Sequence, residues 1–286
     1  MKYAWIAAHR DEFEVEAMCG LLEVGKSGFY ASQSRPLSAR RMRQDKLLVE
    51  IEAVHARSRR IYGSPRVYQE LLAQGEHISE NTVARLMHRA AIRSKIVQRF
   101  VPKTTDSRHN HPVAENVLDR AFEAKKPNRK WVTDITYIET EEGFLYLAGV
   151  LDLHSRKVVG WSMADHMRTE LVEDALKMAV ARRSPEAGVL HHSDRGSQYA
   201  CGDYQELLAQ SGFIGSMSRT GNCYDNAVME SFWGTLKTEL VYHEKYKTRE
   251  QARRSIFEFI EVFYNRVRRH SSIGYVSPEA FEAALN

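Results

Sequence analysis

The feature that most constrains the fold of this chain is a change of hydrophobic periodicity near Arg129. Before this point, apolar residues recur at helical spacing, as they do in residues 42–57. After it, short runs rich in β-branched and aromatic residues alternate with turns and amphipathic segments. The sequence therefore predicts an all-α N-terminal part followed by an α/β domain.

In the N-terminal part we expect several short helices. Residues 11–33 are predicted to be helical around a GKSG turn, and a longer helix is predicted over residues 42–57. Two further helices are expected over 66–72 and 80–91, the first started by Pro65 and the second capped by Ser79. The last helix has an apolar stripe and an opposite polar face, which is typical of a helix–turn–helix, although any small helical bundle shows the same pattern.

Charge is distributed unevenly along the chain. The net charge is −2 over residues 1–34, +9 over residues 35–103 and −3 over residues 104–286, which gives +4 in total. A basic segment joined to a near-neutral domain fits a phosphate-binding module attached to a catalytic one, and the alternative is a solvated basic face. The candidate DNA contacts in this segment are Arg66, Asn81, Arg85, His88 and Arg89.

The second part of the chain predicts an α/β core with a mixed five-stranded sheet and flanking helices. Strands are expected over 130–138, 144–153, 157–164, 188–193 and 213–217. Helices are expected over 170–182 and 199–210, and a long helix starts near Asp225. The predicted domains are an N-terminal helical segment (1–34), a helix–turn–helix domain (35–100), a linker (101–128) with a short helix near 114–124, the catalytic core (129–245) and a C-terminal helical extension of the core (246–286).

Three separated carboxylates are the strongest candidates for chemistry. Asp134 lies in WVTDITY, Asp194 in HHSDRGSQY and Glu230 in NAVMESFWG, with 35 residues between the last two. Two carboxylates 4 Å apart repel by roughly 4 kcal/mol at an effective dielectric of about 20, so such a cluster persists most easily around a cation. Hard oxygen ligands suit Mg²⁺ or Mn²⁺, and two such ions can catalyse an in-line phosphoryl displacement.

The predicted strands and helices bring these side chains to positions from which they can form one site. Asp134 would lie in the first strand and Asp194 at the end of the fourth, and open sheets present ligands at strand ends. Glu230 and Lys237 are seven residues apart, so they point to roughly the same side of the helix that follows the fifth strand. That helix can pack on the sheet while it presents a carboxylate and an ammonium to one site.

Composition excludes other classes of protein. The mean hydropathy is −0.47, and no apolar run approaches the length of a membrane span. The N-terminus does not have the pattern of a signal peptide, and the three cysteines are isolated without a CxxC pair. We therefore expect a protein of the reducing cytoplasm, without a structural zinc site and without a membrane partner.

At this point the motifs resemble a known family. WVTDITY, LDLHSRKVVGW, HHSDRGSQY, SRTGNCYDNAVMESFWGTLKTE and FYNRVRRHSSIGYVSPEAFE occur in this order, after CGLLEVGKSGFYAS and YGSPRVYQEL. Together they resemble the second-frame transposase of the IS3 family of bacterial insertion sequences, within the DDE transposase and retroviral integrase superfamily. The resemblance covers nearly the whole chain and implies an RNase H-like fold for the core.

The resemblance also implies roles for individual residues. Asp134, Asp194 and Glu230 would form the catalytic triad that binds Mg²⁺ or Mn²⁺, with two ions per active site, and Lys237 would contact DNA near the scissile phosphate. The residues implied to shape the site are His192, Gly196, Gln198 and Asn226. Trp131, Trp161 and Trp233 are interpreted as core or wall residues rather than base-stacking groups, and Asp152 as a structural residue of its turn.

The implied function is DNA transposition by 3′-end nicking and strand transfer. Expected partners are the terminal inverted repeats of the element, target DNA, further copies of this chain in a synaptic complex and the upstream-frame product. The expected location is the bacterial cytoplasm, in association with the nucleoid. Two alternatives are a DNA-binding regulator that is inactive without a fused upstream partner, and an RNase H-like nuclease or resolvase that only hydrolyses DNA.

Overall fold

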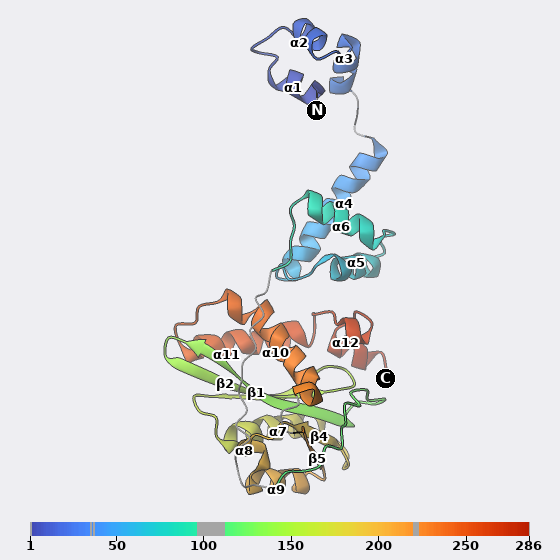
Figure 1. The fold of residues 1–286 in the computed structure, drawn as a ribbon. Helices are drawn as coiled ribbons and strands as arrows, with labels where there is room; N and C mark the ends of the chain where they lie inside the picture. Colours follow the sequence, from blue (N-terminus) through green and yellow to red (C-terminus); the bar gives the residue numbers. More distant parts are fainter. Residues whose placement is uncertain (1, 35, 37, 96–111, 220–222, 286) are drawn as a thin grey trace.

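A mixed five-stranded sheet with helices on both faces forms the C-terminal half of the chain in a computed structural model (Figure 1). The structure describes residues 2–34, 36, 38–95, 112–219 and 223–285. The strand order is β3-β2-β1-β4-β5. The strands are β1 (Lys130–Thr140), β2 (Gly143–Asp152), β3 (Val158–Ala164), β4 (Leu190–Ser193) and β5 (Ile214–Met217).

The strand register explains how two distant carboxylates become neighbours. β1 runs antiparallel to β2 and parallel to β4, and Val132 of β1 pairs with His192 of β4. Asp134 and Asp194 each follow two residues after this pair, so both extend from the same edge region of adjacent parallel strands. The sequence-based prediction that the first and fourth strands present these side chains together is consistent with this register.

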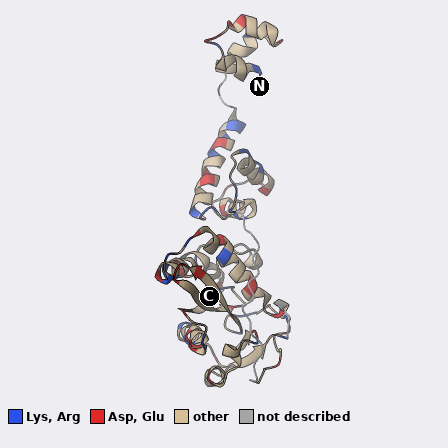
Figure 2. Cartoon of the chain, turned by 60° about the vertical axis from the view of Figure 1, so that its left-hand side comes forward, with Lys and Arg blue, Asp and Glu red and all other residues tan. Residues whose placement is uncertain are grey.

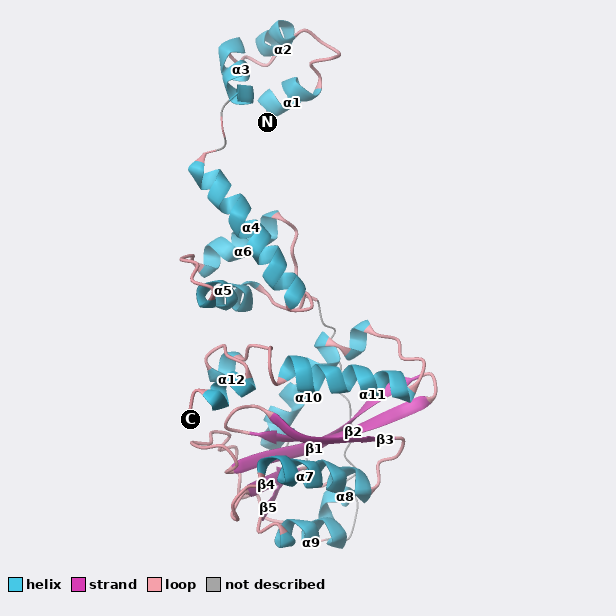
Figure 3. Ribbon diagram, turned by 180° about the vertical axis from the view of Figure 1, so that it is seen from behind, coloured by secondary structure: helices cyan, strands magenta, loops and turns pink. Residues whose placement is uncertain are grey.

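Helices cover the two faces of the sheet as separate layers (Figure 3). One face carries α7 (Thr169–Arg183), α8 (Ser197–Ala200) and α9 (Gly202–Gln210), which share a buried cluster with the sheet around Trp131 and Val150. The other face carries α10 (Ala227–Glu239), α11 (Arg249–Glu258) and the π-helical turn η3 (Phe259–Tyr264). Short 3-10 turns are η1 (Cys223–Asn226), η2 (Val241–His243) and η4 (Ser271–Ile273), and the last helix is α12 (Pro278–Ala283).

The C-terminal segment is built into this core. The Asn265 side chain accepts a hydrogen bond from the Val158 backbone N–H and donates one to the Val158 carbonyl, both at 3.0 Å. These bonds satisfy backbone groups of the edge strand β3 that have no strand partner on that side. Residues beyond 245 therefore bind the edge strand of the sheet as well as cover one of its faces.

The helix–turn–helix region consists of α4 (Ala39–Arg57), α5 (Ser64–Ala73) and α6 (Glu80–Arg89). Ser79 accepts a hydrogen bond from the Thr82 N–H, so it caps α6 as predicted. Val83, Leu86 and Met87 of the predicted stripe are buried. Acidic residues occur among the basic ones along α4, so its charge is mixed rather than uniformly basic (Figure 2).

The first segment forms a separate small helical cluster. Its helices are α1 (Lys2–Ala8), α2 (Val15–Leu21) and α3 (Lys26–Ser34). Ile6, Met18, Cys19 and Phe29 are buried together at its centre. The sequence predicted the second and third helices but not α1.

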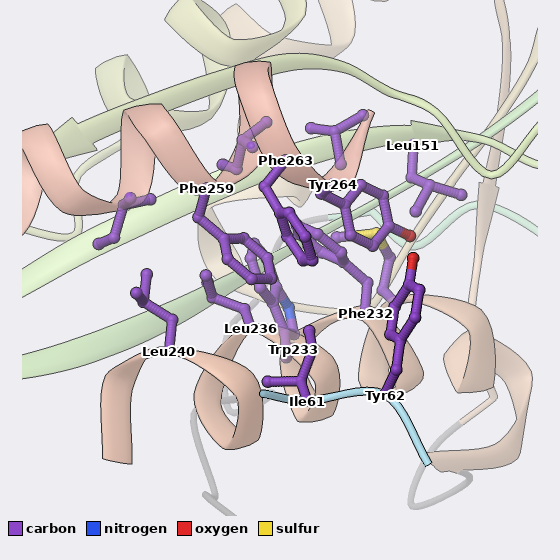
Figure 4. Close-up of a cluster of buried hydrophobic side chains, with 14 of the residues drawn as sticks. Ile61, Tyr62, Leu151, Phe232, Trp233, Leu236, Leu240, Phe259, Phe263 and Tyr264 are labelled. Carbon is purple, nitrogen blue, oxygen red and sulfur yellow. The ribbon is translucent and has the colours of Figure 1, made fainter. Parts of the chain in front are cut away.

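The helix–turn–helix region packs against the α/β core. Ile61 and Tyr62, in the link between α4 and α5, lie beside the aromatic side chains of η3 and α10 (Figure 4). The Tyr62 hydroxyl accepts a hydrogen bond from the Arg269 N–H at 2.7 Å and donates one to the Val267 carbonyl at 3.4 Å. The two regions therefore share one continuous apolar cluster.

Two helix predictions were wrong in detail. The predicted short helix near 114–124 does not form, because the Ser216 hydroxyl accepts the backbone N–H groups of Val117 and Leu118 and the chain then takes positive φ angles at Asp119 and Arg120. The predicted helix over 199–210 is divided into α8 and α9 at Cys201, whose backbone is extended. Residues 101–111 of the predicted linker lie outside the described residues.

Within the described part of the chain, no helix combines the length and apolarity needed to cross a membrane.

Candidate active site

Asp134 lies on β1 and is held by two hydrogen bonds. Its Oδ1 accepts from the Ile135 backbone N–H at 2.8 Å, and its Oδ2 accepts from the Trp233 indole N–H at 3.1 Å. Burial and, second, the nearby Asp194 carboxylate raise the pKa of Asp134 well above its ordinary value. A cation bound here would therefore stabilise the charged form of this carboxylate, which burial and the neighbouring carboxylate destabilise.

Asp194 follows β4 directly and is shaped by the turn after it. Its Oδ1 accepts a hydrogen bond from the Gly196 N–H at 2.9 Å. A Cβ atom on Gly196 would lie 3.1 Å from this same oxygen, so glycine leaves the carboxylate room. The Gln198 side chain donates to the Met167 carbonyl at 2.9 Å and ties this turn to the loop before α7. Gly196 and Gln198 therefore lie in the turn after Asp194, and their role in shaping the site stays a prediction.

Glu230 lies in the first turn of α10 and is exposed. Partial desolvation of its carboxyl group nevertheless raises the pKa of Glu230, and among the causes that raise the pKa of Asp134 the charge of Glu230 is the smallest. In the described ranges, no three His, Cys, Asp or Glu side chains converge closely enough to hold one metal ion. The structure brings Asp134 and Asp194 together and leaves Glu230 at the margin of that pair.

Lys237 lies two turns after Glu230 and is buried against Tyr137, with Nζ 5.0 Å from the ring centroid. Burial lowers the pKa of Lys237 to about 8, against the opposing effect of the Asp134 carboxylate. Lys237 lines an open cavity of about 640 Å³ together with the aromatic rings of Tyr137, Phe144 and Tyr242. The ammonium is thus electrostatically linked to the site from the same helix as Glu230.

His192 and Asn226 support the site from within the protein. The two ring nitrogens of His192 are hydrogen-bonded to the hydroxyls of Ser216 and Ser218, at 2.8 and 3.1 Å. Burial lowers the pKa of His192 to about 4, so this ring is neutral at pH 7 and holds β4 to β5. The Asn226 side chain donates to the Thr133 carbonyl at 3.0 Å and fixes the start of α10 against β1.

Sequence reasoning missed the importance of Asp225. Its carboxylate is fully buried and accepts hydrogen bonds from the side chains of Arg219, Arg120 and Asn116. The hydrogen bonds from Arg219 in particular hold the pKa of Asp225 well below its usual range. Asp225 therefore anchors the turn that leads into α10, whereas from the sequence it was used only to mark where this helix starts.

Comparison with known proteins decides the family. Residues 124–223 and residues 212–278 match two families that are each described as an integrase core domain, and residues 42–100 match an HTH-like domain. The chain is 45% identical to the transposase InsF for insertion sequence IS3A of Escherichia coli (strain K12) over 284 residues, which is 99% of this chain and 98% of that protein. The chain belongs to the IS3 family of insertion-sequence transposases. This confirms the predicted resemblance, fold class and function in DNA transposition and integration.

A second relative also comes from an insertion element, and solved structures show weaker similarity. The transposase is 46% identical to the uncharacterized 31 kDa protein of insertion element IS600 of Shigella sonnei, over 92% of this chain and 97% of that protein. Among solved structures, a simian T-cell lymphotropic virus intasome in complex with PP2A regulatory subunit B56 gamma is similar over 82% of this chain and 74% of that chain, at 15% identity and a TM-score of 0.48. The magnesium complex of the HTLV-2 integrase catalytic core domain covers 55% of this chain and 98% of that chain, at 14% identity and a TM-score of 0.43.

The candidate DNA contacts of the transposase divide into two groups. Asn81, Arg85, His88 and Arg89 are exposed together on α6, opposite its buried stripe, and Arg89 also bonds to Gln44 at 3.0 Å. Arg66 lies apart from this surface. Its guanidinium is 3.6 Å from the Glu239 carboxylate and lies over the Tyr62 ring, in the contact between the helix–turn–helix region and the core. The structure thus shows an intramolecular contact for Arg66, and the DNA contact predicted for this residue stays a prediction.

Proposed function

We propose that this transposase nicks the 3′ ends of its element and joins them to target DNA at a site formed by Asp134, Asp194 and Glu230. The observation that carries the proposal is the placement of Asp134 and Asp194 on adjacent parallel strands, close enough for one carboxylate to raise the pKa of the other. Glu230 supplies the third carboxylate from α10.

The donor set fits a hard divalent cation. Mg²⁺ is usually held by one or two carboxylates together with water and substrate phosphate oxygens, and the Asp134–Asp194 pair provides such carboxylates. Bound there, Mg²⁺ or Mn²⁺, as two ions per site, would neutralise developing charge and activate the attacking oxygen. Asp134 and Asp194 would hold the ions, Glu230 would complete the set, and Lys237 would contact DNA beside the scissile phosphate.

The remaining parts of the chain serve DNA recognition. The exposed face of α6 (Asn81, Arg85, His88 and Arg89) would bind the terminal inverted repeat, largely through phosphates with added base contacts. Strand transfer requires two element ends and a target, so the active form would be a homo-oligomer in a synaptic complex. The upstream-frame product is a further proposed partner, and the proposed location is the cytoplasm beside the nucleoid.

The test uses purified full-length protein, Mg²⁺ and a labelled duplex of its own element end. We expect nicked and joined products with the wild-type protein and neither product with Asp134→Asn, Asp194→Asn or Glu230→Gln. DNA binding by gel shift should be retained in all three variants. Asp203→Asn, which changes an exposed aspartate on α9, is the matched control and should keep both products. Cleavage that persists in all three site variants would exclude this site.

Other outcomes separate the alternatives. Binding of the duplex without nicking or joining indicates a chain that needs the upstream-frame segment, and a fused protein is then tested. A second substrate carries a free 3′-OH at the element end from the start. If the protein nicks the intact duplex but does not join this second substrate to target DNA, the result indicates a nuclease or resolvase.

A further inference from the structure

The Trp233 indole reaches from α10 across the sheet to the Asp134 carboxylate. Its Nε1 donates to Oδ2 at 3.1 Å, and the side chain is buried. The ring also packs against Phe232, with centroids 4.8 Å apart. Packing against Phe232 therefore fixes the Trp233 indole, and the indole in turn holds the Asp134 carboxylate by a hydrogen bond.

Gly149 provides the space that this contact needs. It pairs with Asp134 in the β1–β2 register, so it lies directly beside the carboxylate-bearing residue. A Cβ atom on Gly149 would lie 2.9 Å from Cη2 and 3.4 Å from Cζ2 of Trp233, and 3.5 Å from Cε of Met229. The six-membered ring thus lies against the backbone of β2, and a side chain at position 149 would push it away from the sheet.

The two hydrogen bonds leave each oxygen of the Asp134 carboxylate able to bind one further partner. The Ile135 N–H occupies one lone pair of Oδ1 and the Trp233 N–H occupies one lone pair of Oδ2. Each oxygen of a carboxylate has two lone pairs, so each keeps one for a further partner. A carboxylate bound at both oxygens also cannot rotate freely about its terminal torsion, which fixes the direction of the remaining lone pairs.

We propose that Trp233 is a positioning residue that fixes the orientation of the Asp134 carboxylate for cation binding, and that Gly149 is required because it admits the indole ring. The inference rests on the proposed function, since it takes Asp134 to be a metal ligand. It assigns a role to a tryptophan for which sequence reasoning expected only core or wall packing.

The chain contains a matched control for this contact. Trp161 on β3 donates its indole N–H to the Glu261 carboxylate at 2.6 Å, so it makes the same kind of bond. Trp161 pairs with Gly149 in the β2–β3 register, which places it two strands away from Asp134. Trp161→Phe therefore removes a hydrogen bond of the same kind that does not involve Asp134.

The first experiment measures Mn²⁺ affinity of the full-length protein by isothermal titration calorimetry. Loss of a partner that orients a metal ligand typically lowers metal affinity 10- to 100-fold, so we expect a loss of about tenfold in Trp233→Phe and no measurable loss in Trp161→Phe. The turnover number for nicking should fall in Trp233→Phe, while the KM for the element-end duplex stays unchanged. A role in packing alone would lower the melting temperature without this selective loss.

Gly149→Ala tests the same contact without changing the indole. It should lower Mn²⁺ affinity in the wild-type background and have little further effect in the Trp233→Phe background, because two residues that act through one contact are not additive. If Trp233→Phe fails to fold, the Mn²⁺ affinity of Gly149→Ala alone still tests whether the Trp233–Asp134 contact affects metal binding. Additive losses in the double variant would refute the proposed link between Gly149 and Trp233.

Failure of this inference differs from failure of the proposed function. If Asp134→Asn loses Mn²⁺ affinity and both Trp233→Phe and Gly149→Ala keep it, Trp233 is not a positioning residue although Asp134 remains a ligand. If Asp134→Asn itself binds Mn²⁺ as tightly as the wild type, the metal site proposed here is refuted.

Discussion

The C-terminal end of α10 contains a buried ion pair that allows a quantitative prediction. Glu239 accepts two hydrogen bonds from Arg268, from Nε and Nη2, each at 2.7 Å. The side chains are only 12% and 6% exposed, and Arg66 approaches the same carboxylate at 3.6 Å. Glu239→Gln keeps the shape of the side chain and removes the charge, so the Arg268 guanidinium is left buried without its counter-charge.

Breaking a buried, hydrogen-bonded ion pair by removing one partner typically costs about 3–5 kcal/mol. For a domain of 150–250 residues, each kcal/mol lowers the melting temperature by about 2–4 °C, so we expect a decrease of about 6–20 °C. Because glutamine keeps one acceptor oxygen for Arg268, the decrease should lie in the lower half of this range.

Differential scanning calorimetry of the full-length variant measures this effect. The matched control is Glu250→Gln, which removes an i,i+4 pair with Arg254 whose side chains are 61% and 80% exposed. Exposed pairs of this kind contribute about 0.3–0.5 kcal/mol, so this variant should melt within about 2 °C of the wild type. If the two variants melt at the same temperature, the Glu239–Arg268 pair does not contribute as its burial implies.

Three further predictions concern DNA binding, acid stability and packing. Arg85→Ala should weaken binding of the element-end duplex in a gel shift and leave Mn²⁺ affinity unchanged; unchanged DNA binding would refute the assignment of the exposed face of α6. Asp225→Asn should lower the urea midpoint at pH 7, because the folded-state pKa of Asp225 lies below its unfolded value and the resulting stability is present above the unfolded pKa of about 3.9. This stability is lost as the pH falls through the folded-state pKa, so the difference between variant and wild type should shrink in acid, and a constant difference would contradict the reasoning. Gly160→Ala should lower the free energy of unfolding, measured in urea, by about 1–3 kcal/mol or more, because its Cβ would collide with the backbone of α7. Gly234→Ala, on the exposed side of α10, is the control and should raise the free energy of unfolding by about 0.5–1 kcal/mol.

Local sequence signals were sufficient for most of the fold. The strands of the sheet and the helices α4, α5, α6 and α7 lie within a few residues of their predicted bounds, because each has a clear period and a defined cap or turn. The predicted helix near 114–124 failed for a tertiary reason, since its backbone donors are bound by Ser216, which is distant in sequence. No local pattern reports that competition.

The acidic residues of the candidate site could be proposed from the sequence, but the contacts that hold them in place could not. Asp134, Asp194 and Glu230 were proposed because their motifs and spacing are specific, and β1–β4 pairing brings Asp134 and Asp194 together. The contact between Trp233 and Asp134 depends on the β1–β2 register and on the distance of α10 from the sheet, and neither quantity is expressed in local sequence. The buried role of Asp225 likewise depends on arginines from two separate segments.

One helix connects the DNA-binding region to the proposed catalytic carboxylates. The start of α10 is fixed to β1 by the bond from Asn226 to the Thr133 carbonyl, and its end is held by Arg268. Arg66 of the helix–turn–helix region reaches the same terminal Glu239. Glu230 lies between these two attachments, so its position relative to β1 is set by contacts at both ends of the helix. Glu239 is therefore a contact shared by the helix–turn–helix region, through Arg66, and by the C-terminal segment, through Arg268, at the end of the helix that carries Glu230.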